Sequence, residues 1–203
     1  GPADEPLLDR LRQDRSREVR SAALALLLRL PDAAFTQRAC ARMAALLKHE
    51  RALLRKRWTI DAPTALPADA KADQLDTPRP QHDALGERAW WLYQCVGQVP
   101  LAWWEQHMDM SPADLLAWAQ STEWAKALLR GWRDVLLSTA NPAWCHAFLQ
   151  APAAARQLND TDTLVALLPR ADREAWWQQL QHGAATHLGH FASQMLTGCP
   201  AGE

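Results

Sequence analysis

Residues 11–30 read LRQDRSREVRSAALALLLRL, and this stretch carries the clearest structural pattern in the chain. Asp14 precedes the pair Val19-Arg20, and Ala23 lies inside the leucine-rich run that follows. Asp14 or Ser16 can cap a helix, because a short oxygen-bearing side chain accepts hydrogen bonds from the free amides of the first turn. The spacing of the leucines is typical of an amphipathic helix.

Helix signals continue along most of the chain. Ser111-Pro112 and Asn141-Pro142 each place a capping residue before a proline at the first helical position. Apolar residues recur at three- and four-residue spacing, and alternation at period two never runs beyond a few residues. The sequence therefore predicts an all-α protein without strands, of roughly ten helices joined by short loops that favour antiparallel neighbours.

The helical pattern stops between Trp58 and about Asp83. A loop longer than about 15 residues is uncommon inside a compact domain. We expect a HEAT-like block of helical hairpins at residues 3–57, a connecting loop at 58–84 that lies across the helices after it, and a tryptophan-rich helical block at 85–197. The loop is rich in aspartate, and its prolines are Pro63, Pro67, Pro78 and Pro80.

The composition is that of an ordinary globular protein. The 203 residues are 48% hydrophobic and 22% charged, with a formal net charge of −1. A dedicated nucleic-acid-binding domain is usually strongly basic, so this balance argues against that class but allows a local basic patch. No apolar run reaches the roughly 20 residues that a membrane span needs, and no secretory leader opens the chain.

Four scattered cysteines, Cys40, Cys95, Cys145 and Cys199, form no C-x-x-C pair. We expect reduced, mostly buried thiols and a cytoplasmic location. Gly1-Pro2 has the form of the residues that a tag-cleaving protease leaves behind, so we expect the chain to begin inside a longer protein.

The 11–30 pattern resembles one unit of a HEAT-type helical repeat. The resemblance implies that Val19 packs inward and that Ala23 allows a close helix approach. It also implies that Arg20 reaches an aspartate, in the same or a neighbouring unit, through charge-assisted hydrogen bonds; Asp14 occupies that place here. A repeat array stacks several units to bury a continuous core, so the implied architecture is α-solenoid-like.

A broader resemblance rests on tryptophan-rich motifs. With DRSREVR at 14–20, the segments GERAWWLYQ at 86–94, VPLAWW at 99–104 and LRGW at 129–132 resemble the C-terminal part of a bacterial family, domain-of-unknown-function family 5691. The resemblance covers most of residues 5–180. It implies a helical-repeat protein without an assigned activity, encoded near MoxR-type AAA ATPases and von Willebrand A-domain proteins. It supplies no catalytic residues.

A basic cluster lies at the end of the first block. On a helix, residues 48, 51 and 55 would share one face. Such a cluster is either a solvated helix face near a C-terminus or a patch for an acidic partner or a phosphate backbone, and the acidic loop could also fold back onto it. The candidate partner-binding residues here are Lys48, Arg51, Arg55, Lys56, Arg57 and Trp58.

Eleven tryptophans stand against one tyrosine and three phenylalanines. Six of them form three adjacent pairs, and neighbours on a helix point about 100° apart, so one ring of each pair can enter the core while the other lies at its edge. Such rings are either wedges between helices, with indole N–H groups bonded to backbone acceptors, or exposed anchors for a protein partner. The candidate anchors are Trp91, Trp104 and Trp177, from the pairs Trp90-Trp91, Trp103-Trp104 and Trp176-Trp177.

Three histidines, His182, His187 and His190, lie close together near the end of the chain. A zinc site would need three or four ligands at about 2 Å in tetrahedral geometry. Gly183 and Gly189 interrupt the helix that would hold these ligands, so we expect no metal site.

Signatures of an enzyme are missing from the sequence. It has no P-loop, no G-x-G-x-x-G, no H-E-x-x-H and no G-x-S-x-G. We therefore expect a non-enzymatic helical-repeat scaffold or adaptor, without a cofactor, that binds a protein partner in an AAA-ATPase-linked assembly. The alternative is a HEAT-like nucleic-acid-binding or DNA-glycosylase-like protein that uses the basic cluster at 48–57.

Overall fold

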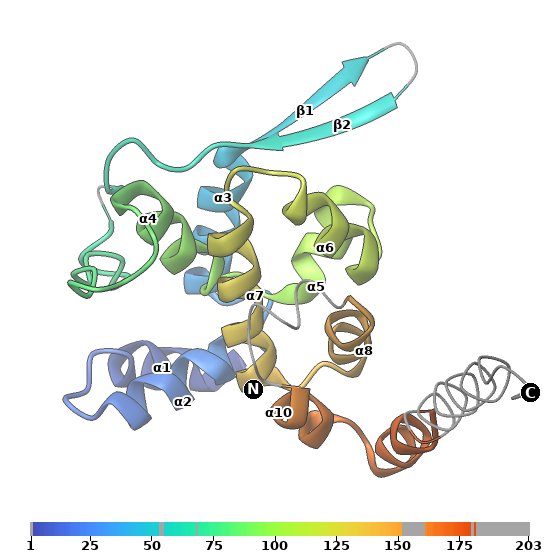
Figure 1. The fold of residues 1–203 in the computed structure, drawn as a ribbon. Coiled ribbons are helices and arrows are strands. Elements are labelled where there is room, and N and C mark those ends of the chain that lie inside the picture. Colours follow the sequence, from blue (N-terminus) through green and yellow to red (C-terminus); the bar gives the residue numbers. More distant parts are fainter. Residues whose placement is uncertain (1, 53–54, 68, 152–160, 180, 182–203) are drawn as a thin grey trace, which may run out of the picture.

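The computed structural model describes residues 2–52, 55–67, 69–151, 161–179 and 181. These residues form a mostly helical protein with one two-stranded sheet (Figure 1). The prediction of an all-α class is confirmed, and the expectation that no strand would occur is wrong. The elements are η1 (Pro2–Asp4), α1 (Glu5–Leu11), α2 (Arg17–Leu27), α3 (Ala34–Leu46), β1 (Leu47–Ala52), β2 (Arg55–Ile60), α4 (Glu87–Val96), α5 (Leu101–Met108), α6 (Pro112–Gln120), α7 (Ala125–Thr139), α8 (Pro142–Gln150) and α10 (Thr161–Leu167). Residues 170–179 are also helical.

Several helices begin where the sequence predicts. The Ser16 hydroxyl accepts a hydrogen bond from the Val19 amide at 3.3 Å and caps α2. Ser111 accepts from the Asp114 amide at 3.2 Å and caps α6, and the Asn141 side chain caps α8 in the same way. The caps satisfy amides that have no partner within their helices.

The segment that resembles a HEAT unit forms α2 and the turn before it. Ala23 is buried, Val19 is half-buried, and α2 packs against α1 and α7. Arg20 Nη1 donates to the carbonyl oxygens of Asp14 and Arg15, at 2.8 and 2.9 Å. The expectation that Arg20 binds the Asp14 carboxylate is therefore wrong. Arg20 instead binds backbone oxygens of the turn between α1 and α2. A solenoid arrangement stays a prediction.

The proline-rich segment between β2 and α4 is packed against the helices on both sides of it. Leu75 is fully buried within it, in a hydrophobic cluster that also holds Met43 of α3 and Trp132 of α7. The Trp90 indole of α4 donates to the carbonyl oxygen of Thr77 at 2.8 Å. A continuous core thus includes residues from all three segments expected from the sequence.

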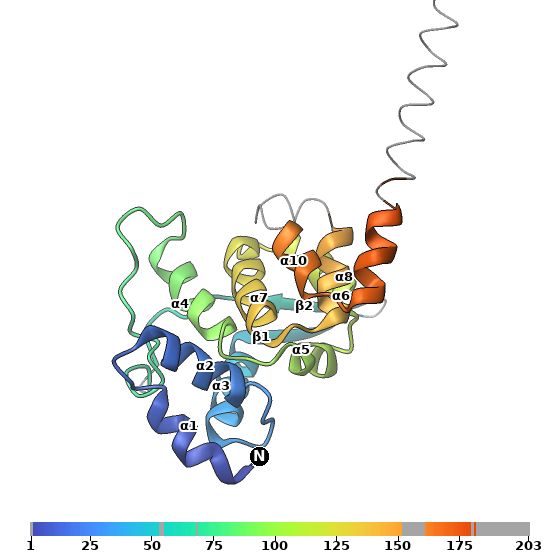
Figure 2. The same ribbon diagram turned by 90° about the horizontal axis from the view of Figure 1, so that it is seen from below.

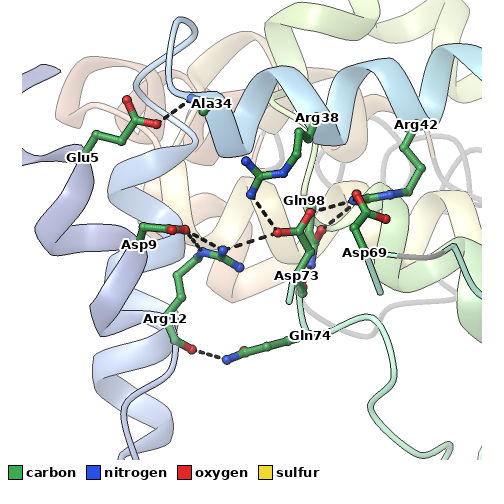
Figure 3. Close-up of polar contacts among 10 residues, drawn as sticks. All are labelled: Glu5, Asp9, Arg12, Ala34, Arg38, Arg42, Asp69, Asp73, Gln74 and Gln98. Atoms are coloured by element: carbon green, nitrogen blue, oxygen red, sulfur yellow. Dashed lines mark hydrogen bonds and ion pairs between the residues drawn. The ribbon is translucent and has the colours of Figure 1, made fainter. Parts of the chain in front are cut away.

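A buried carboxylate fixes this loop to α3 and to the end of α1 (Figure 3). Asp73 has no exposed surface, and it accepts from Arg42 at 2.6 Å, from Arg38 at 3.0 Å and from Arg12 at 3.4 Å. Arg42 also binds Asp69 at 2.6 Å. A buried charge is tolerated only when it is paired and hydrogen-bonded, so these contacts hold the segments in one arrangement.

Three fully buried tryptophans join α5, α7 and α8. The ring centroids of Trp104 and Trp132 are 5.1 Å apart with an interplanar angle of 82°, and those of Trp132 and Trp144 are 5.3 Å apart at 65°. These edge-to-face contacts add to the free energy gained by burying the rings. Figure 2 shows α5, α7 and α8 grouped on one side of the molecule, away from α1.

Helices α4 and α7 approach each other closely at Gly131. A Cβ atom at that position would lie 2.5 Å from Val96 Cγ1 of α4. Alanine is favoured over glycine inside a helix, so glycine in the motif LRGW is explained by the lack of space for a side chain.

We expect Asp73→Asn to lower the free energy of unfolding by about 1.5–3 kcal/mol near pH 7, because a neutral amide replaces a buried carboxylate that accepts several charge-assisted hydrogen bonds. Arg12 and Arg42 each keep one other carboxylate partner, so the loss is smaller than that of leaving a buried charge unpaired. Burial opposes ionisation, but the hydrogen bonds from Arg38 and Arg42 outweigh it and lower the pKa of Asp73 from 3.8. Since the folded-state pKa lies below the unfolded one, the stabilisation is complete above about pH 4 and is lost as the pH falls further. Urea denaturation at several pH values measures both effects.

The exposed Asp32 provides the control for this measurement. Asp32→Asn should leave both the stability and its acid dependence nearly unchanged. An Asp73→Asn protein with wild-type stability would contradict the structural role of the buried carboxylate.

We expect Gly131→Ala to lower the free energy of unfolding by about 1–3 kcal/mol, because overpacking outweighs the gain in helix propensity. Gly97→Ala is the matched control, since its added Cβ would meet ordinary contacts of 3.5 Å or more. Chemical denaturation of the two variants measures the difference, and equal stabilities would show that α4 and α7 separate at little cost.

Candidate functional site

The basic cluster forms a β-hairpin that projects from the helical body (Figure 1). Strand β1 continues directly from α3, and β2 pairs with it in antiparallel register. Leu47 lies opposite Ile60, and His49 lies opposite Trp58. In the described part of the chain the sheet has only these two strands, so the outer backbone edge of each strand faces no further strand.

The base of the hairpin is fixed to the helices α5 and α6. Leu47 and Ile60 are buried there. The Trp58 indole donates to the carbonyl oxygen of Met108 at 3.2 Å, and the Trp118 indole donates to the carbonyl oxygen of Trp58 at 3.0 Å. Both ends of the hairpin thus enter a packed, hydrogen-bonded base, which sets the direction in which it projects.

Four aromatic rings lie in contact at this base, in two tilted pairs and one stacked pair. The Trp58 ring lies between His49, at a centroid distance of 4.6 Å, and His107, at 5.5 Å. His107 in turn stacks nearly parallel on Trp103, at 4.4 Å and 12°. Burial lowers the pKa of His107 below its ordinary value of 6.5, so the ring is neutral and suited to stacking near neutral pH.

The hairpin changes the geometry expected for the basic residues. The prediction that residues 48, 51 and 55 share a helix face is wrong, because they lie on two strands. Lys48 is exposed, and the register places Arg51 opposite Lys56 and Arg55 opposite Ala52. The side chains of residues 50–57, which include Arg57, lie outside the described part of the structure.

The acidic loop makes different contacts from those considered for it. Among the described residues, Asp69 and Asp73 bind arginines of α3 and α1, and no contact of theirs with Lys48 occurs. The loop therefore does pack against the first block, but it binds Arg38 and Arg42 of α3.

The tryptophan pairs divide between core and edge as predicted. Trp104 is fully buried, which makes it wrong as a surface anchor; Trp103, its neighbour, lies at the edge. Trp91 is partly buried against the core, and Trp177 is 53% exposed. Backbone acceptors for the indole N–H are found for Trp58, Trp90 and Trp118, but the buried indole nitrogens of Trp104, Trp124, Trp132 and Trp176 have no partner in the described structure.

Metal-binding groups and reactive thiols were both looked for among the described residues. They contain no group of three or more metal-binding side chains, and His182, His187 and His190 lie outside them. Cys40, Cys95 and Cys145 are free thiols whose pKa burial raises to about 11, so the reactive thiolate is scarce. None of the described helices is long and apolar enough to cross a membrane.

Sequence reasoning missed the residues that support the hairpin. His49, His107 and Trp118 carried no recognisable pattern, because they meet only in the folded protein. The one local signal of a strand is the alternation of the apolar Trp58 and Ile60 with polar neighbours, and it spans only a few residues.

We expect Trp104→Ala to lower the free energy of unfolding by about 3–5 kcal/mol, as removal of a fully buried aromatic ring does. Trp177→Ala should change it by less than about 0.5 kcal/mol, because its ring is largely in solvent. Thermal and urea unfolding of the pair measure the contrast. A destabilised Trp177→Ala protein would show that this ring is packed against the protein in solution.

Comparison with known proteins supports the resemblance found in the tryptophan-rich motifs. A search of curated proteins finds no match, and a search of solved structures finds none either. A family model described as "Family of unknown function (DUF5691)" matches residues 1–202, nearly the whole chain. The chain therefore belongs to the DUF5691 family.

Proposed function

We propose that this chain is a non-enzymatic helical adaptor that binds an acidic protein partner through the hairpin at 47–60. The observation that carries the proposal is the hairpin itself, which projects from a packed helical body on a fixed base (Figure 1). Residues 48–57 contain five basic residues and one acidic residue. A surface of this charge favours association with an acidic partner.

The open backbone edges supply a second mode of recognition. A partner segment in extended conformation can add to a free strand edge through main-chain hydrogen bonds. Lysines and arginines along an edge also oppose unselective strand pairing, so a partner with acidic side chains is favoured over an apolar one. Charge thus selects the partner, and the backbone edge binds it.

The wider setting of the proposal comes from the family. HEAT-like repeats commonly present binding surfaces on a rigid helical frame, and α1 and α2 here serve as one such unit in our proposal. We place the adaptor in the cytoplasm, in an assembly with an AAA ATPase of the MoxR type. The gene neighbourhood that the resemblance of the tryptophan-rich motifs implies motivates this setting.

A second candidate is binding of a nucleic acid by the same hairpin. A two-stranded β-ribbon fits the major groove of DNA, and the basic residues at 48–57 would contact phosphates. Binding of this kind weakens steeply as salt rises, and its ligand is duplex DNA in place of an acidic protein.

The test uses charge reversal with a matched control. Arg55→Glu, Lys56→Glu and Arg57→Glu together should lower partner association about tenfold or more, because three attractive charges become repulsive. The control reverses Arg15, Arg29 and Lys126, which are exposed elsewhere and change the net charge equally. Equal melting temperatures should show that both variants fold.

A photo-reactive amino acid at position 49 identifies the partner in native extract, and the same residue at position 29 serves as the control site. The proposal predicts one acidic protein that crosslinks at position 49 only, is lost in the hairpin variant, and binds again when both proteins are purified. If the purified pair does not bind, or binds both variants equally, the adaptor proposal is wrong. Salt-sensitive binding of duplex DNA that only the hairpin variant loses would favour the second candidate.

A further inference from the structure

A cavity of about 420 Å³ lies where α2, the loop, α4 and α7 meet. We call it the junction cavity. Its volume falls within the range of small-molecule sites in proteins. Among the described residues, none of β1 or β2 lines it, so it is separate from the hairpin.

One wall of the junction cavity carries an unsatisfied donor. Gln94 of α4 lines the cavity, and its Nε2 atom is buried without a hydrogen-bond partner among the described residues. Buried polar groups are nearly always paired. The nitrogen has almost no exposed surface, so a ligand can accept from it only after the Gln94 side chain turns toward the cavity.

The α2 wall adds further donors and positive charge. Arg17 is exposed and makes no ion pair in the described structure, although its charge acts on the nearby Glu18. Arg20 is held by its Nη1 bonds to the α1–α2 turn, which fixes its guanidinium in place. Ser21 lies beside them and contributes a hydroxyl. Guanidinium groups bind carboxylate and phosphate oxygens well.

The other charges at the junction cavity are already paired. Arg12 and Asp73 belong to the buried cluster of Figure 3. Asp134 accepts a hydrogen bond from the Tyr93 hydroxyl at 2.6 Å. Burial, together with Asp134, raises the pKa of Tyr93 to about 12, so that hydroxyl remains a donor. The α2 wall thus carries the two positive charges that a ligand can still reach.

The loop wall is built in a strained conformation. Gln74 has a φ of 57°, a left-handed value that is uncommon for a residue other than glycine. Its side chain donates to the carbonyl oxygen of Arg12. Strain of this kind persists where the surroundings hold it and often accompanies ligand sites. The wall is therefore already formed without a ligand, which reduces the entropy lost when a ligand binds.

An apolar face completes the cavity. Leu24 of α2 and the packed rings of Trp90 and Tyr93, with centroids 5.0 Å apart, line it. We propose that the junction cavity binds a small organic anion, with its single phosphate or carboxylate group between Arg17, Arg20 and the Gln94 amide and its apolar body against Leu24 and Tyr93. Asp134 also lines the cavity, and its carboxylate disfavours a second anionic group on the ligand.

Fragment-sized ligands test this assignment on the full chain. Phenyl phosphate and benzoate carry the two candidate anions on an apolar ring, and benzyl alcohol is the uncharged control. We expect one of the anions to bind with a dissociation constant of about 1 mM or lower and to shift the Gln94 side-chain amide signal in NMR spectra. Its dissociation constant should be lower than that of benzyl alcohol by about tenfold or more. Preference for phenyl phosphate identifies a phosphate ester as the ligand class, and preference for benzoate identifies a carboxylate.

Two variants separate this site from nonspecific binding. Arg17→Glu should weaken the preferred anion about tenfold or more, whereas Arg29→Glu, at an exposed site outside the cavity, should leave the affinity unchanged. Gln94→Leu should abolish binding while the melting temperature stays equal or rises, because it removes an unpaired buried donor. The hairpin variant should bind normally, which makes this test independent of the adaptor proposal. Failure of both anions to move the Gln94 signal, or equal binding by the Arg17→Glu and Arg29→Glu proteins, would overturn the assignment.

Discussion

The pairing of Asp73 with three arginines is the interaction on which the rest of this structure depends. A carboxylate with no exposed surface is costly to bury, and only several charge-assisted hydrogen bonds compensate for that cost. Its partners come from two helices, since Arg12 ends α1 while Arg38 and Arg42 lie on α3. The backbone of Asp73 is held as well, because Gln98 donates to its carbonyl oxygen at 2.5 Å. One residue thereby fixes the loop, the first helices and the end of α4.

Two exposed features follow from this fixed arrangement. With the loop held against α3, the chain leaves β2 close to the helices, and Arg88 of α4 donates to the carbonyl oxygens of Ala62 and Pro63 just after the hairpin. The hairpin therefore projects from a frame that is packed on every described side of its base. The same loop forms the strained wall of the junction cavity at Gln74, the residue after Asp73. Presentation of the hairpin and formation of the cavity thus share one structural cause.

Local signals in the sequence predicted the helical class well. Ser16, Ser111 and Asn141 cap helices because capping depends on a few neighbouring residues, and the division of adjacent tryptophans between core and edge follows from the angle between neighbours on a helix. The hairpin was missed because lysine, arginine, glutamate, alanine and leucine all favour helices. Its strands form because Trp58 is hydrogen-bonded to the distant helix α6 and to the end of α5, and tertiary contacts of that kind leave no local pattern.

The candidate sites could be predicted only in part. The basic residues at 48–57 could be recognised by their charge alone, whereas their arrangement on a hairpin could be seen only in the structure. The junction cavity had no sequence signal, because Arg17, Gln74 and Gln94 lie on three separate segments that meet through long-range packing. The hydrogen-bond acceptor of Arg20 was predicted wrongly for a similar reason. Arg20 binds backbone oxygens, and a pattern of side chains in the sequence does not show such contacts.

The central claim is that the loop is part of the folded body, held there by Asp73, and amide hydrogen exchange tests it most directly. The amides of Asp73 and Leu75 donate to carbonyl oxygens within the loop, at 3.0 and 2.7 Å, and Leu75 is fully buried. The account predicts that these two amides exchange as slowly as those in the middle of α7, since both need the same global unfolding. Exchange of Asp73 and Leu75 at the rate of an unstructured peptide, while α7 stays protected, would contradict it.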